Sequence, residues 1–240
     1  MTNLVDSVNL RAMLIPDPGM IIFDCDFEKA DVFTVVWESG DAELKAALRD
    51  DPENFYDNVT GQYDLPYDTR KRIIHGTNYD GSAKGVAMAV HRPINEIQHI
   101  QRDWFERHPG IKAWHDRIWT TLTSTSPPTI TNRFGFQKRY WGPPDDAMKR
   151  EALAWVPQST VAIATGIAYV RIGEELPWVQ LLLDGHDSIV GQFAEAYWPQ
   201  RNEICDRMSV TVPYPDPMTM VCGIKASGES WAACQTYPWA

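Results

Sequence analysis

Apolar residues are spaced in two ways along this chain, as short runs near both ends and at helical intervals through the middle. The runs predict strands over residues 20–27 and 218–224. Two further runs within residues 179–193 flank an Asp-Gly-His-Asp turn and predict a hairpin, and residues 130–140 predict a second, shorter hairpin. Helical spacing predicts helices over residues 41–49, 66–79, 94–105, 111–122, 146–172 and 195–208.

Turn and breaker residues set the limits of several of these elements. Pro66 starts the second predicted helix, and Asp80-Gly81 ends it. Pro157 predicts a break in the longest helix, and the polar segment 52–65 is expected to be a loop. Helices in the middle with antiparallel strands from both ends predict an α+β fold, in which the first and last thirds of the chain share one sheet.

Composition is that of a folded protein. The 240 residues are 44% hydrophobic and 11% aromatic, enough for one large domain or two small ones, which excludes a disordered chain. The formal net charge of −10 argues against a protein that grips nucleic acid with its whole surface. Positive charge is instead local, in residues 70–72, 133–139 and 149–150, and this pattern leaves room for a basic cleft on an acidic body.

The cysteines and the apolar runs bear on whether the protein is secreted, membrane-bound or cytoplasmic. No CxxC pair and no histidine at zinc spacing accompany the cysteines, so reduced thiols are expected. The N-terminal sequence lacks the pattern of a secretory signal, and runs such as residues 179–183 are too short to cross a bilayer. We therefore expect a cytoplasmic protein without a membrane partner.

Two aspartates carry the clearest candidate chemistry. Asp26 follows an apolar strand, and Asp187 lies at the tip of the predicted hairpin. If these carboxylates lie close together, their repulsion favours cations between them, and two hard cations can activate a hydroxyl and stabilise a leaving pyrophosphate. The alternative for Asp26 is that it is an ordinary turn residue after a strand. Asp184, in the same hairpin, is either a turn former or a further carboxylate that adjusts metal binding.

A second candidate lies on the helix predicted over residues 66–79. Lys71, His75 and Tyr79 are four residues apart, so a helix places a cation, an imidazole and an aromatic ring on one face. Such a face suits a nucleotide, whose phosphates attract the lysine and whose base stacks on rings. The alternative is a solvated basic helix with a half-buried aromatic residue.

In their order along the chain, these motifs resemble those of the family A DNA polymerases, the bacterial polymerase I class, in the palm and fingers. Further segments carry the resemblance: DWFERHPGIKAWHDRI (103–118), NRFGFQKRYW (132–141) and KREALAWVPQSTVAIATG (149–166). It implies a palm, a small antiparallel sheet backed by helices, over residues 1–40 and 151–240, and inserted, mainly helical fingers over 41–150. The thumb and exonuclease have no counterpart.

The resemblance also implies a function and partners. The activity is DNA-directed DNA synthesis, in which a nucleotide is transferred to a primer 3′-hydroxyl with two Mg²⁺ ions, for which Mn²⁺ can substitute. Primer–template DNA and dNTPs are the expected partners. A separate polypeptide carrying a thumb or exonuclease is also expected, as in a phage-type split polymerase in a bacterial or phage-infected cytoplasm.

Individual roles follow from the resemblance, residue by residue. The metal site comprises Asp26, Asp187 and the adjacent Phe27, and Lys71 is a catalytic residue that contacts phosphate. The nucleotide-binding residues are Asp31, which gates the sugar, Lys71, His75, Tyr79 and Arg70. The DNA-binding residues are Arg133, Arg150, Gln158 and His186.

Departures from the family pattern keep two alternatives open. Tyr67, Ala154 and Ser188 stand where the family has Arg, Asn and Glu, and they favour a non-catalytic DNA-binding or assembly subunit that retains the fold. Asp31 stands where the family has Glu, and its shorter side chain favours an enzyme with altered sugar choice.

Overall fold

The computed structural model describes residues 9–235, which divide into two compact units. Residues 9–30 and 161–235 form the sheet unit, and residues 31–160 form the helical unit. The palm and fingers ranges predicted from the sequence stay predictions.

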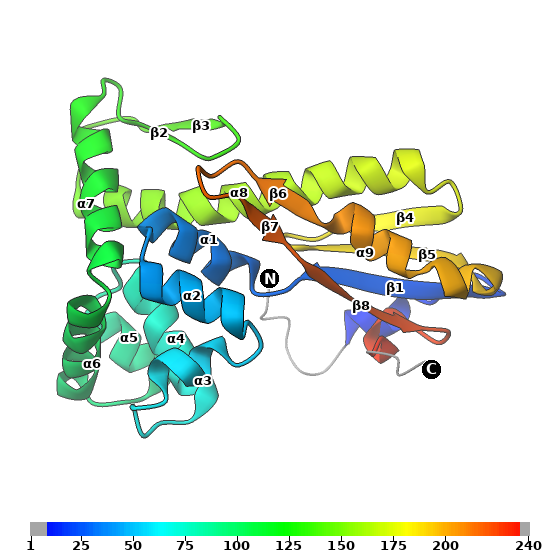
Figure 1. Ribbon diagram of the computed structural model, residues 1–240, viewed down its shortest axis with the longest axis horizontal. Helices are drawn as coiled ribbons and strands as arrows, with labels where there is room; N and C mark the ends of the chain where they lie inside the picture. Colours follow the sequence, from blue (N-terminus) through cyan, green and yellow to red (C-terminus); the bar gives the residue numbers. More distant parts are fainter. Residues whose placement is uncertain (1–8, 236–240) are drawn as a thin grey trace. The chain divides into compact units, whose positions relative to one another are not determined.

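A four-stranded antiparallel sheet is the centre of the sheet unit (Figure 1). Its order is β4-β5-β1-β8, so β1 pairs with β5 on one side and with β8 on the other. Strands from the first and last thirds of the chain therefore share one sheet, as predicted. The strands are β1 (Met20–Phe27), β4 (Val179–Asp184), β5 (Ser188–Ala194) and β8 (Cys222–Ser227).

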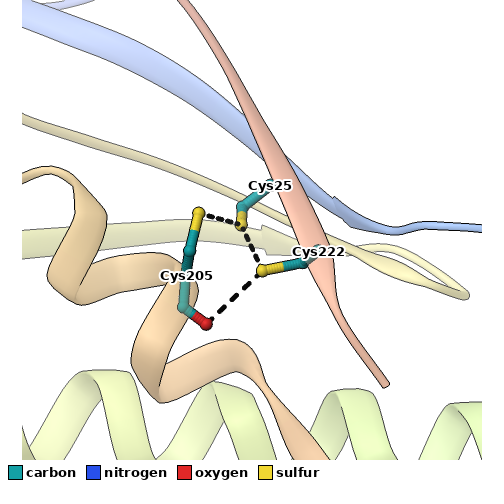
Figure 2. Close-up of side chains that lie close together, drawn as sticks. All are labelled: Cys25, Cys205 and Cys222. Atoms are coloured by element: carbon teal, nitrogen blue, oxygen red, sulfur yellow. Dashed lines mark hydrogen bonds between the residues drawn. The ribbon is translucent and has the colours of Figure 1, made fainter. Parts of the chain in front are cut away.

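The two faces of β1 differ because side chains alternate along a strand. Phe23, Cys25 and Phe27 are buried on one face, against which α9 (Asn202–Met208) packs. Figure 2 shows Cys25 on this face beside Cys205 of α9. The opposite face carries Asp24 and Asp26, and the indole N–H of Trp231 donates to the Asp24 carboxylate at 2.7 Å. The remaining short elements of this unit are η1 (Leu10–Met13), η2 (Glu195–Gln200), β6 (Val210–Val212), β7 (Met218–Met220) and η3 (Trp231–Ala233).

The helical unit is built around buried aromatic side chains. Trp104 and Trp114 are each 1% exposed, and the Trp104 indole N–H donates to the Asn78 side chain at 2.9 Å. The elements are α1 (Ala30–Ser39), α2 (Ala42–Asp50), α3 (Phe55–Thr60), α4 (Tyr67–Asn78), α5 (Ala83–Val90), α6 (Ile94–Arg107), α7 (Pro109–Ser124), β2 (Thr129–Thr131), β3 (Gln137–Arg139) and the first half of α8 (Asp146–Glu175).

Two sequence expectations about helices are wrong. Segment 52–65 is not a loop throughout, because α3 forms there with Phe55, Tyr56 and Val59 buried. Pro157 does not break α8. Proline inside a helix costs about 3 kcal/mol, but buried apolar residues on both sides of it, such as Leu153 and Val161, hold the helix in place.

Other differences concern elements that the sequence pattern merged or missed. The helix predicted over residues 195–208 is divided into η2 and α9, and the strand predicted over 218–224 is divided into β7 and β8. Helices α1 and α5 and strand β6 were not predicted. All of these elements are short, and tertiary packing rather than local periodicity decides their boundaries.

One described helix, α8, is long and apolar enough to cross a membrane by length and composition alone. Core helices of water-soluble proteins meet the same criterion, and 44% of its most apolar window is buried within the protein. The expectation of no membrane partner stays a prediction.

An ion pair just after the C-terminal end of α4 predicts that the stability of the fold depends on pH. The Lys149 ammonium lies 2.9 Å from the Asp80 carboxylate, and the two side chains are 14% and 31% exposed. Burial alone would raise the pKa of Asp80, but the hydrogen bond and charge of Lys149 outweigh burial and lower it. This pair therefore stabilises the fold above the unfolded pKa of Asp80, and its contribution is lost as the pH falls through the folded value.

We expect Lys149→Met to lower the free energy of unfolding by about 1 kcal/mol at pH 7. The deficit should shrink as Asp80 becomes protonated, and urea denaturation across pH 7 to about pH 3 measures it. Lys84→Met, at an exposed lysine of the same unit, is the matched control. A deficit of the same size at both ends of the pH range would contradict the electrostatic explanation.

Candidate active site

The sheet register brings Asp26 and Asp187 to one end of the sheet. Asp26 is the penultimate residue of β1 and lies directly opposite Ser188 of β5. The next residue, Phe27, donates its backbone N–H to the Asp187 carbonyl oxygen at 2.9 Å. Asp187 is exposed in the turn between β4 and β5, as predicted for the tip of the hairpin.

Charge around Asp26 favours a cation. Partial burial raises the pKa of Asp26, and the charges of Asp24 and Asp187 act in the same direction. Lys225 of β8 opposes this rise, with its ammonium nitrogen 3.5 Å from an Asp26 oxygen. Because carboxylate oxygens are the ligands that Mg²⁺ and other hard cations prefer, the chemistry of these donors fits divalent metal ions.

Phe27 and Asp184 differ from this pair in what they can offer. The Phe27 side chain is 2% exposed and apolar, so its carbonyl oxygen is the group that could reach a metal ion. Asp184 is the last residue of β4 and is exposed, at the start of the turn that carries Asp187. Its role stays open between a turn residue and an adjusting carboxylate.

Three of the predicted nucleotide-binding residues meet within the helical unit. The Tyr79 hydroxyl donates to one oxygen of Asp31 at 2.5 Å, and the His75 Nδ1 lies 3.2 Å from the other. The His75 and Tyr79 rings make an edge contact, with centroids 4.9 Å apart. Asp31 enters from the first turn of α1, whereas His75 is on α4 and Tyr79 is the residue that ends it.

Lys71 lies one turn before His75 on α4, and its ammonium nitrogen is 5.9 Å from the centroid of the Tyr56 ring. A cavity of about 780 Å³ within the helical unit is lined by Lys71, Arg72 and His75, with Val86 on its apolar side. Two cationic side chains and an imidazole beside an apolar wall can bind an anion that carries a ring.

Arg70 does not join this face of α4. Its guanidinium forms an ion pair with Asp57 and donates to the Thr60 hydroxyl at 3.2 Å, so it connects α4 to α3. A phosphate contact by Arg70, as predicted, requires this ion pair to open.

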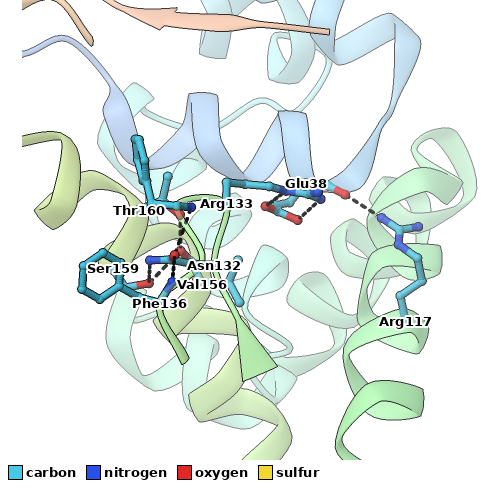
Figure 3. A network of polar contacts seen from close by, with 9 residues as sticks. Glu38, Arg117, Asn132, Arg133, Phe136, Val156, Ser159 and Thr160 are labelled. Atoms are coloured by element: carbon cyan, nitrogen blue, oxygen red, sulfur yellow. Dashed lines mark hydrogen bonds and ion pairs between the residues drawn. The ribbon is translucent and has the colours of Figure 1, made fainter. Parts of the chain in front are cut away.

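Arg133 is held in a similar way by Glu38. Two guanidinium nitrogens of Arg133 donate to the two Glu38 oxygens at 2.8 and 2.9 Å (Figure 3). The adjacent Asn132 closes the turn of the β2–β3 hairpin, because its side-chain oxygen accepts from the backbone N–H groups of Phe134 and Phe136. The Asn132 amide also donates to Ser159 of α8 at 3.0 Å, which fixes the hairpin within the helical unit.

The other predicted DNA-binding residues are accessible. Arg150 and Gln158 are exposed on α8, about two turns apart. His186 is exposed in the β4–β5 turn, and its carbonyl oxygen accepts from the Thr165 hydroxyl at 3.2 Å.

Three features of these sites were not predicted from the sequence: the pairing of Lys225 with Asp26, the pairing of Glu38 with Arg133, and the approach of Cys25, Cys205 and Cys222 to one another. Each joins residues that are distant in sequence. Lys225 approaches Asp26 because it lies opposite Asp24 in the β1–β8 pairing. No local sequence motif predicts that register.

Known proteins resemble this chain in fold and, more weakly, in sequence. No protein-family model matches the chain. The chain is 19% identical to DNA polymerase theta of Caenorhabditis elegans over 232 residues, which are 95% of the chain and 14% of that protein. Its structure matches the POL domain of Pol1 from M. smegmatis, solved in complex with a DNA primer-template and dNTP, with a TM-score of 0.78 and 16% identity. The chain has the fold of a DNA polymerase domain.

The resemblance to family A DNA polymerases and the α+β class are thereby confirmed at the level of the fold. The match covers 93% of this chain and 42% of the Pol1 chain. The chain thus spans less than half the length of either relative. These likenesses show the fold, and the function of the chain and the roles of individual residues stay predictions.

Proposed function

We propose that this chain catalyses DNA-directed DNA synthesis by transferring nucleotides to a primer 3′-hydroxyl. The observation that carries the proposal is the meeting of Asp26 and Asp187 at one end of the sheet in a chain with a polymerase-domain fold. Two carboxylates in this arrangement suit cation-assisted phosphoryl transfer better than they suit an ordinary turn.

Asp26 and Asp187 would hold two Mg²⁺ ions, with the Phe27 carbonyl as an additional oxygen donor. Bound metal ions of this kind lower the pKa of an attacking hydroxyl and neutralise charge on a triphosphate. The β1–β5 register positions the two carboxylates. The protein raises the pKa of Asp26, and a bound cation would lower that pKa again by stabilising the ionised carboxylate. Lys225 would give up its contact with Asp26 when a metal ion binds.

In the helical unit, Lys71 would bind the phosphates of an incoming dNTP, and His75 and Tyr79 would pack against its base or sugar. The hydrogen bond from Tyr79 fixes the Asp31 carboxylate, which supports the role of Asp31 in sugar choice. If Asp31 gates the sugar, Asp31→Ala should incorporate ribonucleotides more readily. An unchanged preference for dNTPs over rNTPs would contradict this role.

Arg150, Gln158 and His186 would contact the primer–template, since all three are exposed. Arg133 would contribute to DNA binding through the hairpin it stabilises, because Glu38 already occupies its guanidinium. The separate thumb or exonuclease polypeptide, the phage-type origin and the cytoplasmic location stay predictions.

A non-catalytic DNA-binding or assembly subunit is the second candidate. Specific observations favour it: Arg70 and Arg133 are engaged by acidic partners within the protein, and Lys225 neutralises Asp26. Such a subunit would keep the fold and lose metal-dependent chemistry, so metal dependence separates the two candidates.

Primer extension by the purified chain at low salt tests the proposal. We expect extension with Mg²⁺, its loss on chelation with EDTA, and recovery on adding Mn²⁺. The expected loss is at least about a thousandfold, since the metal ions supply several kcal/mol of transition-state stabilisation. A folded chain that binds primer–template but extends it with neither metal would contradict the proposal and support the second candidate.

A further inference from the structure

Three cysteines from distant parts of the chain converge within the sheet unit. Cys25 of β1, Cys205 of α9 and Cys222 of β8 place their sulfur atoms within 4.8 Å of one another (Figure 2). The Cys25 sulfur lies 3.8 Å from that of Cys205 and 3.5 Å from that of Cys222. All three are free thiols, since a disulfide would bring two sulfurs to about 2.0 Å.

The spacing of the sulfurs suits a metal ion. Zinc binds thiolates at about 2.3 Å, and tetrahedral geometry then separates the sulfur atoms by about 3.8 Å. Two of the three separations, 3.5 and 3.8 Å, are close to this value, and the third, between Cys205 and Cys222, lies within 4.8 Å. Small movements of the side chains would therefore make all three thiols ligands. From this geometry we propose that Cys25, Cys205 and Cys222 form a site for one thiophilic metal ion, Zn²⁺.

The surroundings are those of a built site. Cys25 is 0% exposed, and the other two cysteines are partly buried, so the sulfurs are largely shielded from water. The Cys222 sulfur also lies 3.4 Å from the Cys205 carbonyl oxygen, which orients Cys222 toward the cluster. Among residues 9–235, no fourth cysteine, histidine or carboxylate joins the group, so water or another external ligand would complete a tetrahedral ion.

This site is separate from the carboxylate pair in position and in chemistry. Cys25 directly precedes Asp26, and the alternation of β1 turns their side chains to opposite faces of the sheet. Soft thiolates select zinc, whereas carboxylates suit magnesium. An ion held by the three sulfurs would connect β1, β8 and α9 behind the strand end that carries Asp26, and it would stabilise that strand end without touching a substrate.

Metal titration of the reduced, untagged, metal-free chain tests the site. We expect one Zn²⁺ per chain, measured by competition with a chromophoric chelator, and a thiolate-to-cobalt charge-transfer band when Co²⁺ is the probe. Zn²⁺ at roughly a hundredfold excess over Kd should raise Tm by about 5–10 °C. Cys205→Ser and Cys222→Ser should each weaken Zn²⁺ binding by at least about a hundredfold and remove the cobalt band.

Cys234→Ser is the matched control, because Cys234 lies in the same unit but outside the cluster. It should keep the zinc affinity of the wild type, and Asp187→Asn should keep the cobalt band, because the band reports thiolate ligands alone. Circular dichroism in EDTA identifies variants that are folded before metal is added. The proposal is overturned if the folded, reduced wild type gives no cobalt band, or if folded Cys205→Ser and Cys222→Ser bind Zn²⁺ as tightly as the wild type.

Discussion

Replacing Asp187 by asparagine is expected to lower the rate of primer extension by about a thousandfold or more while the chain stays folded. Asparagine preserves the shape of the turn but removes the negative charge that would hold a metal ion. Asp187 is exposed, so the change should have little effect on the free energy of unfolding. Single-turnover extension and thermal unfolding, measured on the same preparation, separate the two effects.

Asp26→Asn should show the same loss of extension together with a gain in stability. The folded protein raises the pKa of Asp26, chiefly by burial, so ionisation of Asp26 opposes folding. The contribution of Asp26 to stability is complete below its unfolded pKa, where the carboxyl is protonated, and is lost as the pH rises through its folded pKa. In EDTA, Asp26→Asn should therefore have a higher Tm than the wild type at pH 7, and the difference should shrink below about pH 4.

Asp184→Asn is the control for both variants, because it removes a carboxylate from the same hairpin. We expect extension within a few-fold of the wild type, in keeping with a turn residue or an adjusting carboxylate. Wild-type extension rates in both Asp26→Asn and Asp187→Asn would exclude these carboxylates from the mechanism.

Arg133→Ala is expected to lower the free energy of unfolding by about 2 kcal/mol. The Glu38 side chain is 7% exposed and would be left as a buried carboxylate without its bidentate partner. Removing one partner of a fully buried pair costs about 3–5 kcal/mol, and the cost expected here is smaller than that range because Arg133 is 39% exposed and solvent screens the pair. Urea denaturation at pH 7 measures the change.

A matched control and a rescue variant test the cause of this loss. Arg139→Ala removes an exposed arginine from the same hairpin and should change stability by less than about 0.5 kcal/mol. Adding Glu38→Gln to Arg133→Ala should recover part of the loss, because the buried group is then neutral. If Arg133→Ala unfolds like the wild type but binds primer–template weakly, Arg133 contacts DNA directly and its pairing with Glu38 is secondary.

The sequence predicted elements whose ends carry strong local signals. The hairpin around Asp187 was predicted because Asp-Gly between apolar runs specifies a tight turn, and α4 was predicted because Pro66 and Asp80-Gly81 mark its limits. Helix α3 was missed because its six residues are too few to display a period, and burial of Phe55 rather than local preference stabilises it.

The same distinction separates the predicted from the unpredicted parts of the site. Asp26 and Asp187 could be paired in advance because each adjoins a recognisable strand and their order resembles that of a known family. The partners of Asp26 and Arg133 could not be, since Lys225 and Glu38 reach them through tertiary contacts. The spacing of the three cysteines in the sequence follows no metal-binding motif and predicts separate thiols, whereas strand pairing and the packing of α9 bring them together.

The central position of β1 implies that the two aspartates differ in how often their backbones open. Amides of β1 are bonded to strands on both sides, so hydrogen exchange there should require the largest openings of the sheet unit. Asp187 lies in an exposed turn, where local opening costs little and exchange should be fast. Asp26 therefore lies on a backbone that is expected to open rarely, whereas Asp187 lies on one that opens readily and that a bound metal ion would stabilise. Slower hydrogen exchange in the Asp187 turn would then report that the proposed metal site is occupied.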